Sequence, residues 1–203
     1  MQKTIRIIAI GCFLAILTAC IPKTPSHVQN ICDVFMQYPK WYYYAKKSAK
    51  RWGVPVAVQM AIIYQESRFN ATAKPPRTHL LWVIPWSRES SSYGYTQALK
   101  ETWERYESTT GDSADRDGFA ASTDFIGWFG YQAYRKAKIP RDQAYYLYLA
   151  YHEGIGGYQS RSYLHKKWLI DVAHHVSYRA QVYQQQLDHC ANDIPSHFWW
   201  GLF

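Results

Sequence analysis

Apolar side chains recur at helical spacing along most of the chain, and they are densest between Pro55 and Ala73. Pro55 suits a first helical residue because its missing N–H would be unsatisfied there anyway. Val58, Ala61 and Ile62 form one apolar face. Other apolar residues extend this stripe around the helix: Met60, Ile63 and Tyr64. The pattern predicts a helix in the centre of a domain rather than on its surface.

The same periodicity predicts further helices, separated by Gly and Pro at the breaks. No segment shows the sustained alternation of a strand, and no repeat is found. Residues 74–93 contain three prolines and four serines, which predicts a long irregular connection. The fold class is therefore all-α, a bundle of about six helices with a cleft. The helices outside the central one are expected at 38–52, 97–108, 119–137, 142–153 and 165–188.

The first 19 residues have the pattern of an export signal. Lys3 and Arg6 precede an apolar run at 7–17 that is short for a membrane span. The run ends in Leu-Thr-Ala-Cys20, which resembles a bacterial lipobox and implies cleavage before Cys20 and its acylation. A generic signal peptide with an incidental cysteine is the alternative. We expect a lipidated tether at 20–37 and a domain at 38–203.

Two cysteines, Cys32 and Cys190, remain after Cys12 leaves with the signal and Cys20 is acylated. They lie near the two ends of the mature chain and suit one disulfide in an oxidising compartment. Closing so long a loop would stabilise the fold by roughly 4–5 kcal/mol in the chain-entropy model. Two buried free thiols are the alternative.

The formal charge is +8, and it becomes +6 once the two cations of the signal are removed. A basic exported protein is attracted to anionic surfaces, including cell-wall peptides with their carboxylates. No nucleic-acid motif is found, and the export signal argues against nucleic-acid binding. Aromatic residues make up 17% of the chain, which suits a saccharide groove as well as an ordinary core.

Glu66 is a carboxylate near the C-terminal end of the apolar central helix. Loss of solvent at such a position disfavours the charged form and raises the pKa of the group. A carboxylic acid that is protonated near neutral pH suits general acid catalysis. The alternative is an ordinary exposed glutamate in the last turn of a helix.

Three short motifs follow one another along the chain. Glu66-Ser67-x-Phe69 with a later Ala73, then 94–97 (GYTQ), then 150–154 (AYHEG), resemble the ESxFxxxA, GLMQ and AYNAG signatures of SLT-type lytic transglycosylases. That family has a goose-lysozyme-like helical fold with a substrate cleft. The resemblance covers roughly residues 40–185, and the order of the motifs makes it specific.

The resemblance implies cleavage of the MurNAc–GlcNAc β-1,4 bond in peptidoglycan without water. Glu66 would protonate the glycosidic oxygen as general acid. The resulting carboxylate would then take the proton of the muramyl C6 hydroxyl, which closes on C1 and leaves a 1,6-anhydromuramyl end. No cofactor is needed for this reaction.

The motifs also imply the residues that contact the substrate. Gly94 would let the backbone approach the sugar, and Gln97 would offer its amide to N-acetyl or carboxyl groups. Tyr151 would lie close to Glu66, although a core tyrosine is the alternative. Tyr95 belongs to the expected substrate-binding set. Ser67 either bonds to Glu66 or caps the turn after it.

The chain departs from the family pattern at several of these positions. His152 and Glu153 replace Asn and Ala of the third motif, and Tyr95-Thr96 replace Leu-Met of the second, so this is a divergent branch. Glu153 either contacts substrate as a second carboxylate, which would favour hydrolysis, or is solvated at a helix end. The connection at 74–93 is longer than the corresponding segment of the family pattern. It either forms one edge of the substrate groove or packs on the domain.

No metal site is expected. The acidic run from Ser113 to Asp124 resembles a calcium loop only loosely, and the histidines have no zinc spacing. We expect a monomer that is anchored in the periplasm through Cys20, at the outer membrane because Ile21 and not Asp follows the cysteine. A hydrolytic muramidase and an inactive wall-binding or secretion scaffold are the alternative functions. Cleavage position and partner machinery stay open.

Overall fold

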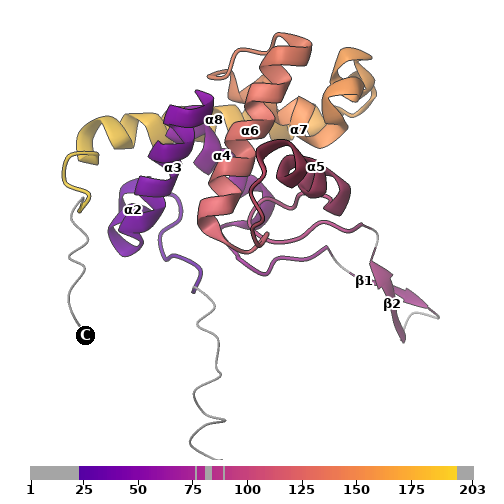
Figure 1. Ribbon diagram of the computed structural model, residues 1–203, viewed down its shortest axis with the longest axis horizontal. Coiled ribbons are helices and arrows are strands. Elements are labelled where there is room, and N and C mark those ends of the chain that lie inside the picture. Colours follow the sequence, from indigo (N-terminus) through magenta and orange to yellow (C-terminus); the bar gives the residue numbers. More distant parts are fainter. Residues whose placement is uncertain (1–22, 76, 81–83, 89, 196–203) are drawn as a thin grey trace, which may run out of the picture.

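The computed structural model describes residues 23–75, 77–80, 84–88 and 90–195 (Figure 1). The predicted signal segment and Cys20 lie outside these residues. The predicted all-α fold is confirmed, with a small hairpin added to it. The elements in chain order are α2 (Ile31–Gln37), α3 (Pro39–Trp52), α4 (Val56–Ser67), β1 (Arg77–Leu80), β2 (Ile84–Arg88), α5 (Lys100–Thr110), α6 (Phe119–Ala137), α7 (Ala144–Gln159), the 3-10 turn η1 (Ser162–His165) and α8 (Lys167–Cys190).

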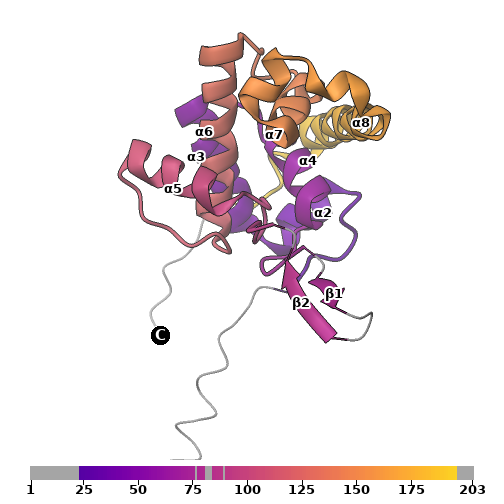
Figure 2. The same cartoon turned by 90° about the vertical axis from the view of Figure 1, so that its right-hand side faces the viewer.

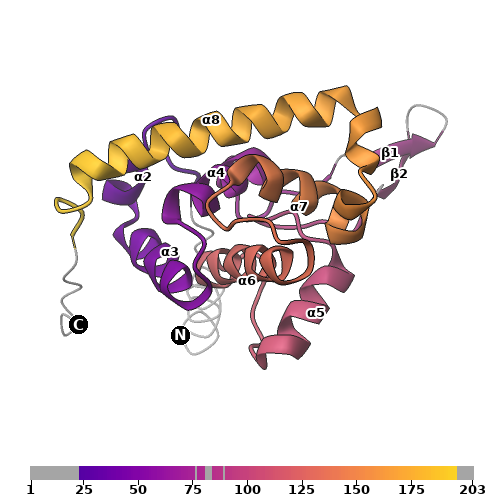
Figure 3. The same ribbon diagram turned by 90° about the horizontal axis from the view of Figure 1, so that it is seen from above.

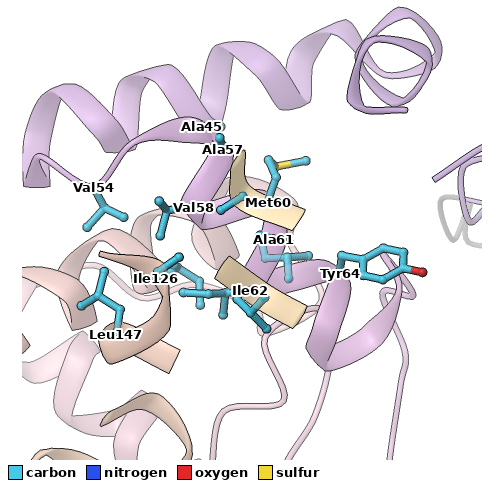
Figure 4. Packing of buried hydrophobic residues seen from close by; sticks show 14 of the residues in the cluster. Ala45, Val54, Ala57, Val58, Met60, Ala61, Ile62, Tyr64, Ile126 and Leu147 are labelled. Carbon is cyan, nitrogen blue, oxygen red and sulfur yellow. The ribbon is translucent and has the colours of Figure 1, made fainter. Parts of the chain in front are cut away.

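Helix α4 lies in the centre of the domain, as its pattern predicts. Every residue from 57 to 64 is buried, and the helix packs against α3, α6, α7 and α8. Figure 4 shows two of its apolar side chains, Val58 and Ile62, near Ile126 of α6, with Leu147 of α7 on the same side of the helix. Full burial of such a side chain stabilises the fold by about 1.5–3 kcal/mol, so this contact region is a main part of the core.

The long helix α8 lies across α2, α4 and α7 (Figure 3). Its buried positions recur at helical spacing, so one face covers the domain and the other meets solvent. A disulfide between Cys32 and Cys190 joins the end of α8 to the start of α2, with the two Cα atoms 6.1 Å apart. The predicted pairing of these cysteines is therefore confirmed.

The predicted start of the folded domain is wrong. Residues 31–37, expected in the tether, form helix α2, whose Ile31, Val34 and Phe35 are buried in the core. The side chain of Asn30 caps this helix by accepting from the Cys32 amide at 3.0 Å. The folded domain consequently begins before residue 38.

The connection after α4 also differs from its prediction. Strands β1 and β2 pair antiparallel, with His79 opposite Pro85 and Leu80 opposite Ile84, and the hairpin extends away from the helices (Figure 2). That residues 74–93 form one edge of the substrate groove stays a prediction, because the structure does not describe the side chains of 76–89. Among the described residues, no helix has the length and apolar character needed to cross a bilayer.

Candidate active site

A cavity of about 830 Å³ opens between the end of α4, the loop before α5, and helices α5, α6 and α7. Residues from all three sequence motifs line it, although they are far apart in the chain. The lining residues are Glu66, Ser90, Ser92, Gln97, Ala98, Leu99, Thr102, Arg105, Thr109, Phe125, Trp128, Phe129, Gln132, Lys136, Tyr151, His152, Glu153, Gly154, Ile155, Gly156 and Gln159.

Glu66 stands in the last turn of α4, where the apolar helix meets the cavity. The helix ends there because Arg68 and Phe69 both adopt positive φ, at 50° and 62°. Burial disfavours the charged carboxylate and raises the pKa of Glu66 to about 7. The group is therefore partly protonated at neutral pH.

Two tyrosines of α7 face this carboxylate. The hydroxyl of Tyr148 interacts with Glu66 and works against the rise in the pKa of that group. Tyr151 is partly buried and lies close enough for the charge of Glu66 to help raise the tyrosine's own pKa, after the effect of desolvation. The Tyr151 hydroxyl donates to the Thr96 carbonyl at 2.7 Å. Tyr151 thus lies beside Glu66, as the resemblance implied, and also links α7 to the second motif.

Gln97 connects the second motif to the chain that leaves α4. Its Nε2 donates to the carbonyls of Ala73 at 2.9 Å and Gly94 at 2.8 Å, and its Oε1 accepts from the Ser92 hydroxyl at 3.2 Å. Both amide hydrogens are thus used inside the protein. The side chain lines the cavity, and its bonds fix the shape of this loop, in which Gln97 itself has a positive φ of 49°.

Three of the predicted contact residues do not line the cavity. Tyr95 is fully buried and packs edge-on against Trp41 and Phe119, so it has a packing role in place of the expected substrate contact. Gly94 has φ +76°, and a Cβ there would lie 2.1 Å from the Arg116 carbonyl. The close approach that needs this glycine is therefore to protein backbone.

Ser67 is the third of these residues. Its hydroxyl donates to the Ile63 carbonyl one turn earlier on α4, at 3.2 Å. This bond is neither of the two expected ones, because it runs back to the preceding turn of α4 and not to Glu66 or to the turn that follows.

Glu153 lines the cavity, yet its carboxylate is held by neighbouring groups. Lys166 donates to Oε1 at 2.7 Å, His152 Nδ1 lies 3.1 Å from the same oxygen, and the Ser162 hydroxyl bonds to Oε2. The side chain is only 5% exposed. Burial acts to raise its pKa, but the three bonds outweigh burial and lower the pKa of Glu153 to about 2. Glu153 is therefore ionised and engaged, not solvated.

Sequence reasoning missed the α6 wall of the cavity and the partner of Glu66. Phe125, Trp128, Phe129 and Gln132 follow one another at helical spacing on α6 and line one side of the cavity. The apolar stripe of the predicted helix at 119–137 contained this signal but did not distinguish a cavity wall from core. Tyr148 precedes Tyr151 by three positions on the same helix, so the i, i+3 spacing could have identified it.

The described residues contain no group of three or more His, Cys, Asp or Glu side chains that could hold a metal ion. Asp124, the last position of the calcium-like run, instead accepts from Arg51 at 3.0 Å, Trp52 at 2.9 Å and Tyr106 at 2.9 Å. These bonds give the carboxylate a structural role between α3, α5 and α6.

Comparison with known families gives one result. The family model described as "Transglycosylase SLT domain" matches residues 8–190. The match begins inside the predicted signal segment and reaches the last residue of α8. No curated protein and no solved structure matches the chain.

Proposed function

We propose that this chain, which belongs to the transglycosylase SLT domain family, is a peptidoglycan lytic transglycosylase in which Glu66 performs both proton transfers. The family membership implies an enzyme of this kind acting on peptidoglycan. The finer statement, that cleavage leaves a 1,6-anhydromuramyl end, is our proposal for this chain.

The observation that carries the proposal is the environment of Glu66. Burial at the end of an apolar helix raises its pKa to about 7, so the acid form is available at neutral pH in a cavity large enough for sugar rings. Glu66 gives its proton to the glycosidic oxygen as the bond to C1 breaks. Its carboxylate then receives the proton of the C6 hydroxyl as the C6 oxygen bonds to C1, so no water is consumed.

The state of Glu153 supports transglycosylation over hydrolysis. An inverting hydrolase needs a second carboxylate that can activate water, and a retaining one needs a free carboxylate nucleophile. Both oxygens of Glu153 already accept bonds, from Lys166 and His152 at Oε1 and from Ser162 at Oε2. A carboxylate held in this way is poorly suited to either role.

The charges of the cavity support an anionic substrate. Arg105 of α5 and Lys136 of α6 line it, and neither takes part in an ion pair of the described chain. Glu153 is neutralised by Lys166, and Glu66 is partly protonated. Such a cavity suits glycan strands that carry peptide carboxylates better than bare glycan.

We also propose that the chain works from a lipid anchor on Cys20, facing the periplasm at the outer membrane. The support is the sequence alone: a basic start, an apolar run, and Leu17-Thr18-Ala19-Cys20 followed by Ile21. The intact mass of the purified protein tests the anchor, because acylation and loss of the signal segment both change that mass.

Mass spectrometry of the muropeptides released from purified peptidoglycan tests the proposed reaction. We expect anhydromuramyl products with the wild-type protein and none with Glu66→Gln. Glu104→Gln is a matched control, because it changes an exposed glutamate of α5 that is paired with Lys100 outside the cavity lining.

Each other result contradicts part of the proposal. Hydrated muramyl ends that disappear with Glu66→Gln would mean a hydrolytic muramidase. Binding to peptidoglycan without products from either protein would mean an inactive wall-binding or scaffold protein.

A further inference from the structure

Helix α3 carries a basic outer face, defined here as Tyr43, Lys46, Lys47 and Lys50. These residues follow the spacing i, i+3, i+4, i+7 and therefore share one side of the helix. All four are exposed, and Tyr43 is 58% exposed. The opposite side of α3 is buried through Trp41, Ala45 and Ser48. The fourteen residues of α3 contain no Asp or Glu.

Within the described part of the chain, the lysines of this outer face have no acidic partner. Among the described residues, the ion pairs involve other groups. Lys46 lies 5.1 Å from the ring centre of Tyr42, a contact that leaves its charge uncompensated. The neighbouring Arg51 shows the contrast, since it pairs with Asp112 and Asp124 at 3.0 Å each. The outer face is thus a surface of uncompensated positive charge with one exposed aromatic ring.

The start of the described chain is fixed next to α3. The hydroxyl of Tyr38, the residue before α3, donates to the Lys23 carbonyl at 2.5 Å. Cys20 is three residues before Lys23, and three residues span at most about 11 Å. An acyl group on Cys20 would therefore hold a membrane surface within about 11 Å of Lys23, which contacts the residue before α3.

We propose that the outer face of α3 rests on the surface of an anionic phospholipid bilayer. This inference rests on the proposed acylation of Cys20, but it does not need the proposed reaction. Lysines attract anionic headgroups, and an exposed tyrosine suits the bilayer interface. An anionic wall polymer offers the same charge, but only the bilayer is brought to this face by the anchor.

Placing α3 on the bilayer also fixes where the cavity lies, because α6 separates α3 from the cavity. Gly127 of α6 lies against Ser48 and Trp52 of α3, and a Cβ there would lie 2.4 Å from the Ser48 hydroxyl oxygen. Trp128 and Phe129 on another side of α6 line the cavity. Figure 3 shows α3 and α5 on opposite sides of α6. With α3 on the membrane, α6 would lie between the membrane and the cavity.

Lysine footprinting of the purified, acylated chain in vesicles tests the inference. Vesicles of phosphatidylcholine alone are compared with vesicles that also contain anionic phosphatidylglycerol, whose negative surface potential attracts lysines. We expect labelling of Lys46, Lys47 and Lys50 to slow several-fold in the anionic vesicles only, and to recover at high salt. Lys100 and Lys167, which are 69% and 87% exposed on other helices, are the internal controls.

A variant supplies the second measurement. Tyr43→Ser, at an exposed position, should weaken the protection of the three lysines without changing their labelling in neutral vesicles. Tyr178→Ser, at a position 68% exposed on α8, is the matched control. It should change neither the protection in anionic vesicles nor the labelling in neutral vesicles.

Equal labelling of the three lysines in both kinds of vesicle would overturn the inference. So would protection by purified peptidoglycan instead of vesicles, which would assign this face to the wall. An unacylated intact mass would remove the anchor that the inference needs. None of these readouts depends on turnover, so a failed enzyme assay and a failed footprint are separate results.

Discussion

Two glutamates line the same cavity and are held in opposite electrostatic states. Glu66 lies at the end of the apolar helix α4 beside the Tyr148 hydroxyl, and burial raises its pKa to about 7. Glu153 accepts bonds from Lys166, Ser162 and His152, which lower its pKa to about 2 against the effect of burial. Burial alone does not determine the charge of a carboxylate, because the number and charge of its hydrogen-bond donors can outweigh burial. Only Glu66 can give up a proton at neutral pH.

The largest expected difference between the two glutamates is in the rate of glycan cleavage. Glu66→Gln should lower the rate of glycan cleavage by about 10²–10⁴-fold, the usual contribution of general acid–base catalysis. Glu153→Gln should lower it by less than about tenfold, because that side chain holds η1 and α8 and transfers no proton. Rates from release of muropeptides under identical conditions check both values. Equal losses in the two variants would contradict the division of roles.

The second test is the stability of Glu66→Gln. The folded pKa of Glu66, about 7, exceeds its ordinary value of 4.5, so the wild-type protein loses stability as pH rises from about 4.5 to 7. Glutamine cannot ionise, so the variant avoids this loss. It should be more stable than wild type by about 3 kcal/mol at pH 8 and nearly equal at pH 5. Urea unfolding at both pH values measures this difference, and a constant difference would contradict the raised pKa.

The third test is the stability of Glu153→Gln, which should change in the opposite direction to that of Glu66→Gln. The folded pKa of Glu153, about 2, is below its ordinary value of 4.5, so its stabilisation is present above pH 4.5 and is lost as pH falls toward 2. Glu153→Gln should therefore destabilise the protein by about 2 kcal/mol at pH 7, as expected for loss of bonds to a charged group. Thermal unfolding at pH 7 and pH 3 checks this. A loss that is as large at pH 3 would show that packing, not charge, is responsible.

The smallest test concerns Tyr148. Its hydroxyl favours the charged form of Glu66, so Tyr148→Phe should raise the pKa of Glu66 further. The wild-type kcat/KM should fall as pH rises above about 7, and the variant should shift this limb upward by about half a pH unit. Tyr146→Phe, on the same helix and 43% exposed, is the control and should leave the limb unchanged. A downward shift with Tyr148→Phe would contradict the role of the hydroxyl.

Much of the fold could be predicted from local pattern. The helix over 119–137 is found with the same bounds, and Gly53 and Gly111 end α3 and α5 in the left-handed conformation that glycine favours. Helix α7 continues past its predicted end because Gly154 kinks it without ending it, at φ 75° and ψ 158°. A glycine in the sequence does not distinguish these two outcomes.

The misses have a common physical cause. Helix α2 has only seven residues, and its stability comes from burying Ile31, Val34 and Phe35 against the rest of the domain and from the disulfide. No local pattern of that length predicts such contacts. The motifs identified Glu66, Gln97 and Tyr151 as neighbours. They could not indicate that Tyr95 faces the core, because alternate residues of an irregular loop have no fixed direction.

The disulfide also determines how the domain bears a mechanical load. Cys32 is the second residue of α2, and its partner Cys190 ends α8. A pull on the N-terminal segment would otherwise peel α2 from the domain one turn at a time. The covalent link stops this at Cys32 and passes the force to α8, which lies along α4 and α7 over much of its length. The helices that shape the cleft are then loaded together, from the side, and none is unravelled from its end.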